Sequence, residues 1–208
     1  MTRPLHPIRL HGFALSGHAH RVRLMLSMLD LPFTWVDVNL PAGEHKQPPF
    51  LALNPFGQVP VIEDGDLVLA DSNAILVYLA LTYDDSRRWL PADARTQAQV
   101  QRWLSVAAGP LASGPAAARV NVLFKRPHNP VAISTAQSLF TVMDQHLQGR
   151  DWLAAEHATL ADVALHTYTA HAPEGGVSLE PYAQLRAWLQ RVQALPGFVA
   201  MASSPLPG

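Results

Sequence analysis

The residues best suited to chemistry lie in segment 54–72, which reads Asn-Pro-Phe-Gly-Gln-Val-Pro-Val-Ile-Glu-Asp-Gly-Asp-Leu-Val-Leu-Ala-Asp-Ser. Proline is normally excluded from strand interiors because it lacks the N–H that a ladder needs. The Val59–Pro60 bond therefore indicates either an edge strand or a cis peptide held for a purpose. Asp71 and Ser72 are both good helix N-caps, and the free N–H groups of a helix start suit an anion.

The elements that position this segment form a mixed α/β region. The pattern predicts strands at 8–11 and 33–38, separated by a helix with apolar spacing over 22–29. Segment 41–49 is polar and rich in proline, and it receives no assignment. Segment 54–72 then adds two strands joined by a hairpin turn, followed by a helix. Because a hairpin makes two of the strands antiparallel, the four-stranded sheet is expected to be mixed.

The rest of the chain is rich in alanine and in helical periodicity. We expect an α/β domain over 1–83, a polar linker over 84–92 and an all-helical domain over 93–208. Gly109-Pro110 and Gly114-Pro115 are expected to break what would otherwise be one long helix. The apolar spacing predicts helices at 95–108, 131–147, 160–170 and 182–195.

Composition favours a globular enzyme, with 49% hydrophobic and 15% charged residues and a formal net charge of −1. Without a basic block, nucleic acid is not an expected partner. The absence of cysteine excludes disulfides, thiolate metal sites and a nucleophilic cysteine. The first residues lack a signal-peptide core, and no apolar run approaches the ~20 residues of a membrane span. We therefore expect a cytoplasmic protein that does not enter the membrane.

These features resemble the cytosolic glutathione S-transferase family, and within it the bacterial Ser-type, theta/beta-like members. The resemblance covers essentially the whole chain and is most specific at the Asn-Pro-x-Gly-x-Val-Pro turn of 54–60 and at Asp71-Ser72. Thr159-Leu160-Ala161-Asp162 is similar to the family's capping box, in which the Thr159 hydroxyl and the Asp162 carboxylate each accept from a backbone N–H. The resemblance implies a thioredoxin-like N-terminal domain, an all-helical C-terminal domain, glutathione as co-substrate and a homodimer.

The resemblance also implies which residues contact glutathione. Val59 would pair its backbone N–H and C=O with the cysteinyl part of the ligand, as a neighbouring strand would, and Pro60 would be cis. Asp71 would meet the γ-glutamyl ammonium, and Ser72 the γ-glutamyl carboxylate. The alternatives are an ordinary edge proline and a plain helix cap.

The glycyl end of glutathione has two candidate partners. Gln58 matches the family position that reaches the glycyl carboxylate. His45 resembles a histidine with the same task in theta-like members, and the alternative for His45 is a solvated loop residue.

The thiol of glutathione must ionise before it can attack, because only ~3% of a thiol with a pKa of about 8.5 is thiolate at pH 7. The family places a Tyr, Ser or Cys donor after the first strand, and Ser16 is the candidate here. Its hydroxyl would donate to the sulfur at a helix start whose dipole favours negative charge, unless it only caps the helix. His18 departs from the Ser-Gly-Asn pattern of many bacterial members.

We hypothesise that His18, as a neutral imidazole, is a second donor to the thiolate. The helix N-terminus should depress its pKa, whereas a bound thiolate should raise it. A solvated histidine in the first helical turn is the alternative.

Other polar and aromatic residues have simpler interpretations. His18 and His20 lie on different helix faces and lack a completing carboxylate cluster, so no metal site is predicted. Arg21 and Arg23 are interpreted as solvated charges on a helix face. The second substrate would bind between the domains, in a region that includes Trp103, Val106, Phe124 and Tyr168.

The sequence therefore predicts a glutathione transferase, with a role in detoxification, that stabilises the glutathione thiolate for attack on a hydrophobic electrophile. Two alternatives stay open. One is reduction of disulfides or peroxides by glutathione at the same site. The other is a glutathione-binding protein without activity. The pattern does not identify the second substrate.

Overall fold

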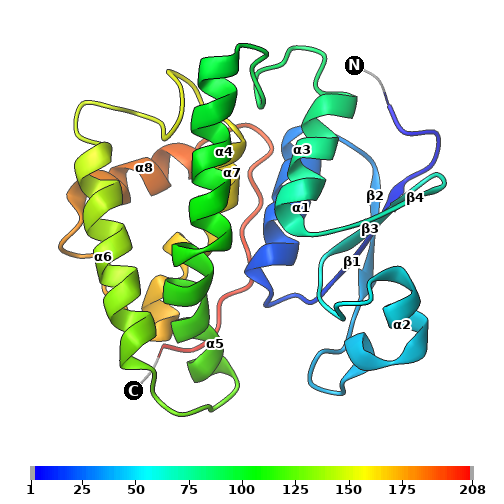
Figure 1. The fold of residues 1–208 in the computed structure, drawn as a ribbon, viewed down its shortest axis with the longest axis horizontal. Helices are drawn as coiled ribbons and strands as arrows, with labels where there is room; N and C mark the ends of the chain where they lie inside the picture. Colours follow the sequence, from blue (N-terminus) through cyan, green and yellow to red (C-terminus); the bar gives the residue numbers. More distant parts are fainter. Residues whose placement is uncertain (1–2, 207–208) are drawn as a thin grey trace. The chain divides into compact units, whose positions relative to one another are not determined.

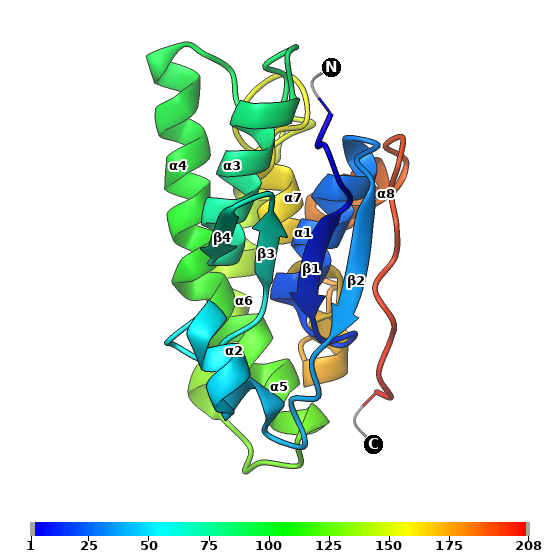
Figure 2. The same cartoon turned by 90° about the vertical axis from the view of Figure 1, so that its right-hand side faces the viewer.

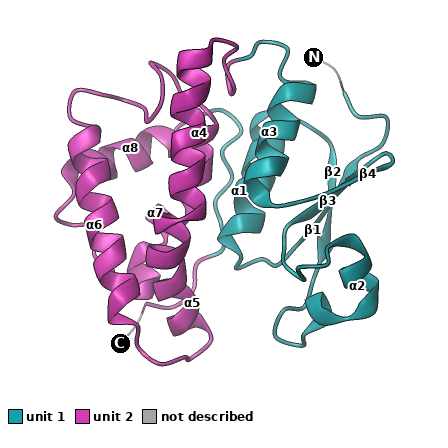
Figure 3. Cartoon of the chain, viewed as in Figure 1, with its two compact units in different colours: residues 1–87, 196–202 teal, residues 88–195, 203–208 magenta. Residues whose placement is uncertain are grey.

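The computed structural model describes residues 3–206, and the chain divides into two compact units (Figure 3). Unit 1 comprises residues 1–87 and 196–202, and unit 2 comprises 88–195 and 203–208. The division between 87 and 88 falls inside the expected linker. The C-terminal part differs from the expected boundaries. Residues 196–202 belong to unit 1, although the sequence placed them in the helical domain over 93–208. One reason is that His20 Nε2 donates to the Val199 carbonyl oxygen over 2.9 Å.

Unit 1 is a thioredoxin-like domain built on a four-stranded mixed sheet with the order β2-β1-β3-β4. Strands β1 and β2 are parallel, and the other two pairings are antiparallel. Helices α1 and α3 cover one face of the sheet, and the short helix α2 lies on the other (Figures 1 and 2). The bounds are β1 Ile8–Gly12, α1 Gly17–Met28, β2 Phe33–Asp37, α2 Pro48–Leu53, β3 Val61–Asp64, β4 Leu67–Ala70 and α3 Ser72–Tyr83.

The core of unit 1 follows from the apolar spacing of these elements. Ile8 and Leu10 alternate along β1 and are fully buried. Val22 and Met25 on α1 recur at helical spacing and are also fully buried, as is Leu76 on α3. Helices α1 and α3 also pack against each other within unit 1.

Segment 41–49, which the sequence left unassigned, contains a 3-10 turn, η1 (Glu44–Lys46), and the start of α2. Helix α2 begins with proline, which is tolerated in the first turn because that N–H would have no partner within the helix. Only Phe50 of this six-residue helix is buried. A helix this short and this exposed has no apolar periodicity to recognise.

Unit 2 is all-helical, as expected. In the described part of the chain it includes a π-helical turn, η2 (Ala112–Ala116), and a 3-10 turn, η3 (Ala172–Gly175). Helix α7 is its centre, since every residue from 160 to 169 is buried. Over residues 3–206, no helix has both the length and the apolar character needed to cross a membrane. The α-helices are α4 Ala94–Ala108, α5 Ala117–Leu123, α6 Pro130–His146, α7 Leu160–Ala170 and α8 Ala183–Gln193.

The two expected helix breaks had different outcomes. Gly109 does end α4. The break at Gly114-Pro115 is wrong, because both residues lie inside η2, which leads directly into α5. A π-helical turn changes the hydrogen-bond ladder locally and so tolerates a residue without an N–H. Gly114 is needed for packing, since a Cβ there would lie 2.9 Å from the backbone nitrogen of Ala136 on α6.

The capping box at the start of α7 is confirmed. Asp162 Oδ2 accepts from the Thr159 N–H over 2.9 Å, and the Thr159 hydroxyl accepts from the Ala161 N–H over 3.3 Å. Asp162 Oδ1 also accepts from Trp188 Nε1–H over 2.9 Å and from the Leu153 N–H over 3.1 Å. Burial raises the pKa of Asp162, and these hydrogen bonds oppose that rise.

We predict that Asp162→Ala lowers the free energy of unfolding of the helical unit by about 3 kcal/mol or more. The change leaves buried N–H groups of Leu153, Thr159 and Trp188 without their acceptor, and each such loss costs about 1–3 kcal/mol. Urea unfolding followed by circular dichroism measures the effect. Asn129, which caps α6 through one bond of 3.0 Å from Ala132, is the control, and Asn129→Ala should cost about 1 kcal/mol. Equal losses in the two variants would contradict the central role of Asp162.

Candidate functional site

Unit 1 contains a cleft of about 850 Å³. Its walls come from the start of α1, from η1 and α2, from the loop at 54–60, from the end of β4 and from the start of α3. Every residue that the sequence predicted for the glutathione site lines this cleft: Ser16, His18, His45, Gln58, Val59, Pro60, Asp71 and Ser72. The fold thus brings together side chains that are separated by more than fifty residues of sequence, such as His18 and Ser72, whose contact spans 54 positions.

The loop before β3 presents backbone to the cleft. The Val59–Pro60 peptide bond is cis. Asn54 holds the loop in shape, because its Nδ2 donates to the Gln58 carbonyl over 2.8 Å and its Oδ1 accepts from the Phe56 N–H over 3.1 Å. Within residues 3–206, neither the N–H nor the C=O of Val59 takes part in a hydrogen bond. Both groups can therefore pair with an extended ligand as a neighbouring strand would.

The start of α3 is capped by Asp71, whose backbone has φ 72° and ψ 119°. Positive φ is uncommon for a residue other than glycine and occurs often at ligand sites. Asp71 Oδ1 accepts from the N–H groups of Asn73 over 3.0 Å and of Ala74 over 2.9 Å. Since both capping bonds use Oδ1, Oδ2 keeps its capacity to accept from a ligand. Capping and ligand binding can therefore coexist in this exposed side chain.

Ser16 caps α1 in a similar way. Its hydroxyl oxygen accepts from the Ala19 N–H over 3.3 Å. The side chain is half-buried and faces the cleft. Because the cap uses a lone pair of the oxygen, the hydroxyl hydrogen is available to donate to a bound anion.

His18 lies one residue inside α1 and contacts the start of α3, where its Nδ1 is 3.3 Å from Ser72 Oγ. Burial, together with the nearby charge of Arg21, lowers the pKa of His18 to about 3. The expected direction of the shift is correct. Desolvation and a neighbouring cation account for the shift, whereas the sequence argument relied on the helix N-terminus.

Arg21 is not the solvated charge that the sequence predicted, since its side chain is 0% exposed. Its Nη1 donates to Asn73 Oδ1 over 2.9 Å and to Ser72 Oγ over 3.3 Å, both in the first turn of α3. Arg23 is exposed, as expected. Residues two apart point to different sides of a helix, so one arginine of α1 faces α3 while the other faces solvent.

The segment at 44–46 contributes a cation that sequence reasoning missed. Lys46 lines the cleft, and its Nζ donates to the carbonyl oxygens of Gly57 over 2.9 Å and of Phe56 over 3.2 Å. Burial, and then the charge of Lys46, lower the pKa of His45. His45 Nδ1 is buried and has no hydrogen-bond partner within the described residues. The available signal was a lysine directly after the candidate His45.

Two further expectations concern groups outside this cleft. In residues 3–206, no group of three or more His, Asp or Glu side chains is arranged to hold a metal ion. Of the aromatic residues suggested near a second substrate, Trp103 and Tyr168 are buried in unit 2. Trp103 also donates from Nε1 to the Leu153 carbonyl over 2.9 Å, which is a structural contact.

Comparisons with known proteins agree with this architecture. The model described as "Glutathione S-transferase, N-terminal domain" matches residues 15–82, and "Glutathione S-transferase, C-terminal domain" matches residues 130–196. The chain is 36% identical to Glutathione S-transferase 3 of Zea mays, over 97% of this chain and 96% of that protein. It is 32% identical to Glutathione S-transferase theta-1 of Mus musculus, over 91% and 84%.

A solved structure gives the same result in three dimensions. The crystal structure of glutathione S-transferase from Pseudomonas fluorescens matches with a TM-score of 0.89 at 34% sequence identity. The match covers 95% of this chain and 100% of that one.

We predict that His18 stays uncharged between pH 8 and about pH 4, because its folded pKa of about 3 lies well below the 6.5 of a free histidine. Protonation then favours the unfolded chain, so the stability that His18 contributes is complete above pH 6.5 and is lost as the pH falls toward 3. An NMR titration of the histidine ring protons measures this, with the urea-unfolded chain as reference. A folded-state midpoint for His18 near that of the unfolded chain would contradict the prediction.

Proposed function

This chain belongs to the glutathione S-transferase family, and from that premise we propose that it is a Ser-type enzyme, similar to bacterial theta/beta-like members. In this proposal it binds glutathione in the cleft of unit 1 and stabilises the thiolate for attack on an electrophilic small molecule. The supporting observation is that all residues predicted to contact glutathione from sequence line one cleft. We further propose a role in detoxification, and a location in the cytoplasm, where thiols stay reduced.

The γ-glutamyl and cysteinyl parts of glutathione would lie along the loop at 54–60 and the start of α3. Val59 would exchange backbone hydrogen bonds with the cysteinyl residue, next to the cis bond to Pro60. Asp71 Oδ2 would accept from the γ-glutamyl ammonium. Ser72 would donate to the γ-glutamyl carboxylate, which the dipole of α3 also favours.

The glycyl carboxylate would lie at the opposite end of the cleft, beside Gln58 and η1. Lys46 would attract this carboxylate by charge, and Gln58 would donate from its amide. His45, whose Nδ1 has no protein partner in the described chain, would donate to the same carboxylate.

Ser16 would stabilise the thiolate. Its hydroxyl would donate to the sulfur, while the N-terminus of α1 favours negative charge at that point. The ionised sulfur would then attack an electrophilic carbon, so that a C–S bond forms and the leaving group departs with its electron pair. Lowering the thiol pKa by two units requires about 2.7 kcal/mol of selective stabilisation of the anion. The role that the sequence suggested for His18, a second donor to the sulfur, requires the hydrogen to lie on Nε2.

Calorimetric titration tests glutathione binding. Glutathione should bind the wild-type protein. Glutathione whose glycyl carboxylate is converted to an amide lacks the negative charge at that end, and it should bind about tenfold more weakly. Lys46→Gln should weaken glutathione binding and leave the amide nearly unchanged. Turnover with glutathione is then compared on a chlorinated nitroarene, a mixed disulfide and an organic peroxide. Turnover of only the last two would favour the reductase alternative, binding without turnover would favour a non-catalytic role, and no binding would refute the proposal.

We predict that Ser16→Ala raises the pKa of the bound thiol toward the free value. A return from about 6.5 to about 8.5 would lower the thiolate fraction, and with it the conjugation rate, by up to about 25-fold at pH 7. Absorbance of the bound thiolate measures the pKa. Ser16→Thr keeps a hydroxyl and a helix cap, so it should retain the low pKa, and Ser27→Ala at the other end of α1 is the control. An unchanged thiol pKa in Ser16→Ala would remove Ser16 from the mechanism.

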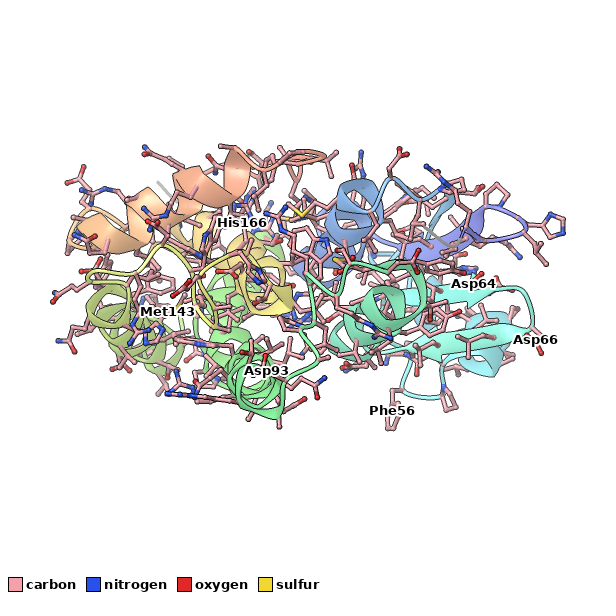
Figure 4. The ribbon with its side chains drawn as sticks, turned by 90° about the horizontal axis from the view of Figure 1, so that it is seen from above. Phe56, Asp64, Asp66, Asp93, Met143 and His166 are labelled. Atoms are coloured by element: carbon pink, nitrogen blue, oxygen red, sulfur yellow. The ribbon has the colours of Figure 1, made fainter. Side chains whose placement is uncertain are left out.

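We also propose that the protein is a homodimer. Phe56 supports this, because its side chain is 80% exposed at the tip of the 54–60 loop, where it projects away from unit 1 (Figure 4). Buried aromatic anchors are typical of protein interfaces. We predict that light scattering finds a dimer for the wild-type protein, and that Phe56→Asp raises the dissociation constant of the dimer at least tenfold. A wild-type monomer at micromolar concentration would contradict the proposal.

A further inference from the structure

The Ser72 hydroxyl has two polar neighbours within unit 1. Arg21 Nη1 and His18 Nδ1 each lie 3.3 Å from Ser72 Oγ. A hydroxyl has one hydrogen to donate and two lone pairs that accept. Because a guanidinium only donates, Arg21 must occupy one lone pair of the Ser72 oxygen. The direction of the Ser72 hydrogen then depends on His18.

His18 can meet Ser72 in two ways. If the His18 hydrogen lies on Nε2, then Nδ1 accepts from Ser72, and the hydroxyl hydrogen points at the imidazole. If the hydrogen lies on Nδ1, His18 donates to the second lone pair of Ser72. With both lone pairs occupied, the hydroxyl hydrogen must point away from these two partners. A neutral imidazole has one N–H only, and the low pKa of His18 keeps it neutral.

We propose that His18 is a positioning residue, which donates from Nδ1 to Ser72 and, together with Arg21, directs the Ser72 hydroxyl hydrogen to the γ-glutamyl carboxylate of the ligand. This inference rests on the proposed glutathione site. The ligand itself selects the tautomer, since a hydrogen bond from a hydroxyl to a carboxylate is roughly twice as strong as one to a neutral acceptor.

The two possible roles of His18 exclude each other. When the hydrogen lies on Nδ1, the Nε2 atom holds a lone pair and has nothing to donate to a thiolate. A His18 that supports Ser72 therefore leaves the sulfur to Ser16 and to the N-terminus of α1. It also sets specificity, because a Ser72 oxygen with two donors against it can only donate, and the ligand must present an acceptor there.

Arg21 supports the same subsite in a second way. Its buried guanidinium is held against the first turn of α3 by the 2.9 Å bond to Asn73. The positive charge adds to that of the helix N-terminus and favours a carboxylate at this point. Arg21 thus contributes both the fixed hydrogen bond and the local potential.

A double-mutant cycle tests the proposal, with the dissociation constant of S-methylglutathione measured by calorimetry. This probe has no free thiol, so a contact with the thiolate cannot contribute. Ser72→Ala should weaken binding about tenfold, and His18→Ala about fivefold. In the Ser72→Ala background, His18→Ala should have an effect below twofold, because its route to the ligand is gone. If the increases in the dissociation constant caused by His18→Ala and by Ser72→Ala multiply in the double variant, the two residues act independently and the proposal is overturned.

Two spectroscopic measurements complete the test. The thiol pKa of bound glutathione should be the same in wild type and His18→Ala, and a raised pKa in the variant would show a contact with sulfur instead. In the wild-type complex, ¹⁵N NMR of the labelled histidine rings should find the His18 hydrogen on Nδ1, and a hydrogen on Nε2 would overturn the inference. His20→Ala, from the same helix but outside the cleft, should leave binding unchanged.

The outcomes separate this inference from the function on which it rests. If S-methylglutathione and glutathione fail to bind the wild-type protein, the proposed function and this inference fall together. If the ligand binds but the His18 hydrogen lies on Nε2, this inference alone is overturned. The same holds if the ligand binds but the effects of His18→Ala and Ser72→Ala are independent.

Discussion

The side chain of Arg21 holds a full positive charge inside unit 1, and the arrangement around the cleft depends on it. A buried charge is costly unless polar groups are arranged around it. Here acceptors come from the first turn of α3, where Asn73 Oδ1 lies 2.9 Å and Ser72 Oγ 3.3 Å from Arg21 Nη1. Because Arg21 belongs to α1, this requirement ties α1 to the start of α3. The same charge contributes to the low pKa of His18.

At the two helix starts of the cleft, the capping side chains use only some of their polar atoms for the cap, and the other polar atoms remain available to a ligand. Asp71 caps α3 with Oδ1 alone, and Ser16 caps α1 with a lone pair of its oxygen. The remaining carboxylate oxygen and the hydroxyl hydrogen are the groups that a γ-glutamyl ammonium and a thiolate need. A cap and a ligand contact are therefore not competing explanations of these residues. This is why residue type alone did not distinguish them.

The sequence predicted the strands, α1, α3 and most helices of unit 2, because apolar residues recur along these elements at strand or helix spacing. It missed α2, whose six residues bury only Phe50, and it mistook the π-helical turn at Gly114-Pro115 for a break. The same limit applies at the site. Arg21 was misread because its partner Asn73 lies 52 positions away, and only the packing of α1 on α3 shows that it is buried. Lys46 was missed because its segment had no recognisable pattern.

A histidine at position 18, in place of the asparagine of the resembling pattern, changes which hydrogen bonds this position can make at the same time. An asparagine amide, which the resembling pattern has at this position, carries a donor and an acceptor at once and needs no choice between them. A neutral imidazole has a single hydrogen, so support for Ser72 and donation to sulfur become alternatives. Burial beside Arg21 removes the third possibility, an imidazolium that donates from both nitrogens. In the proposed site, the single proton of the His18 ring therefore serves Ser72, and activation of the thiol is left to Ser16 and the N-terminus of α1.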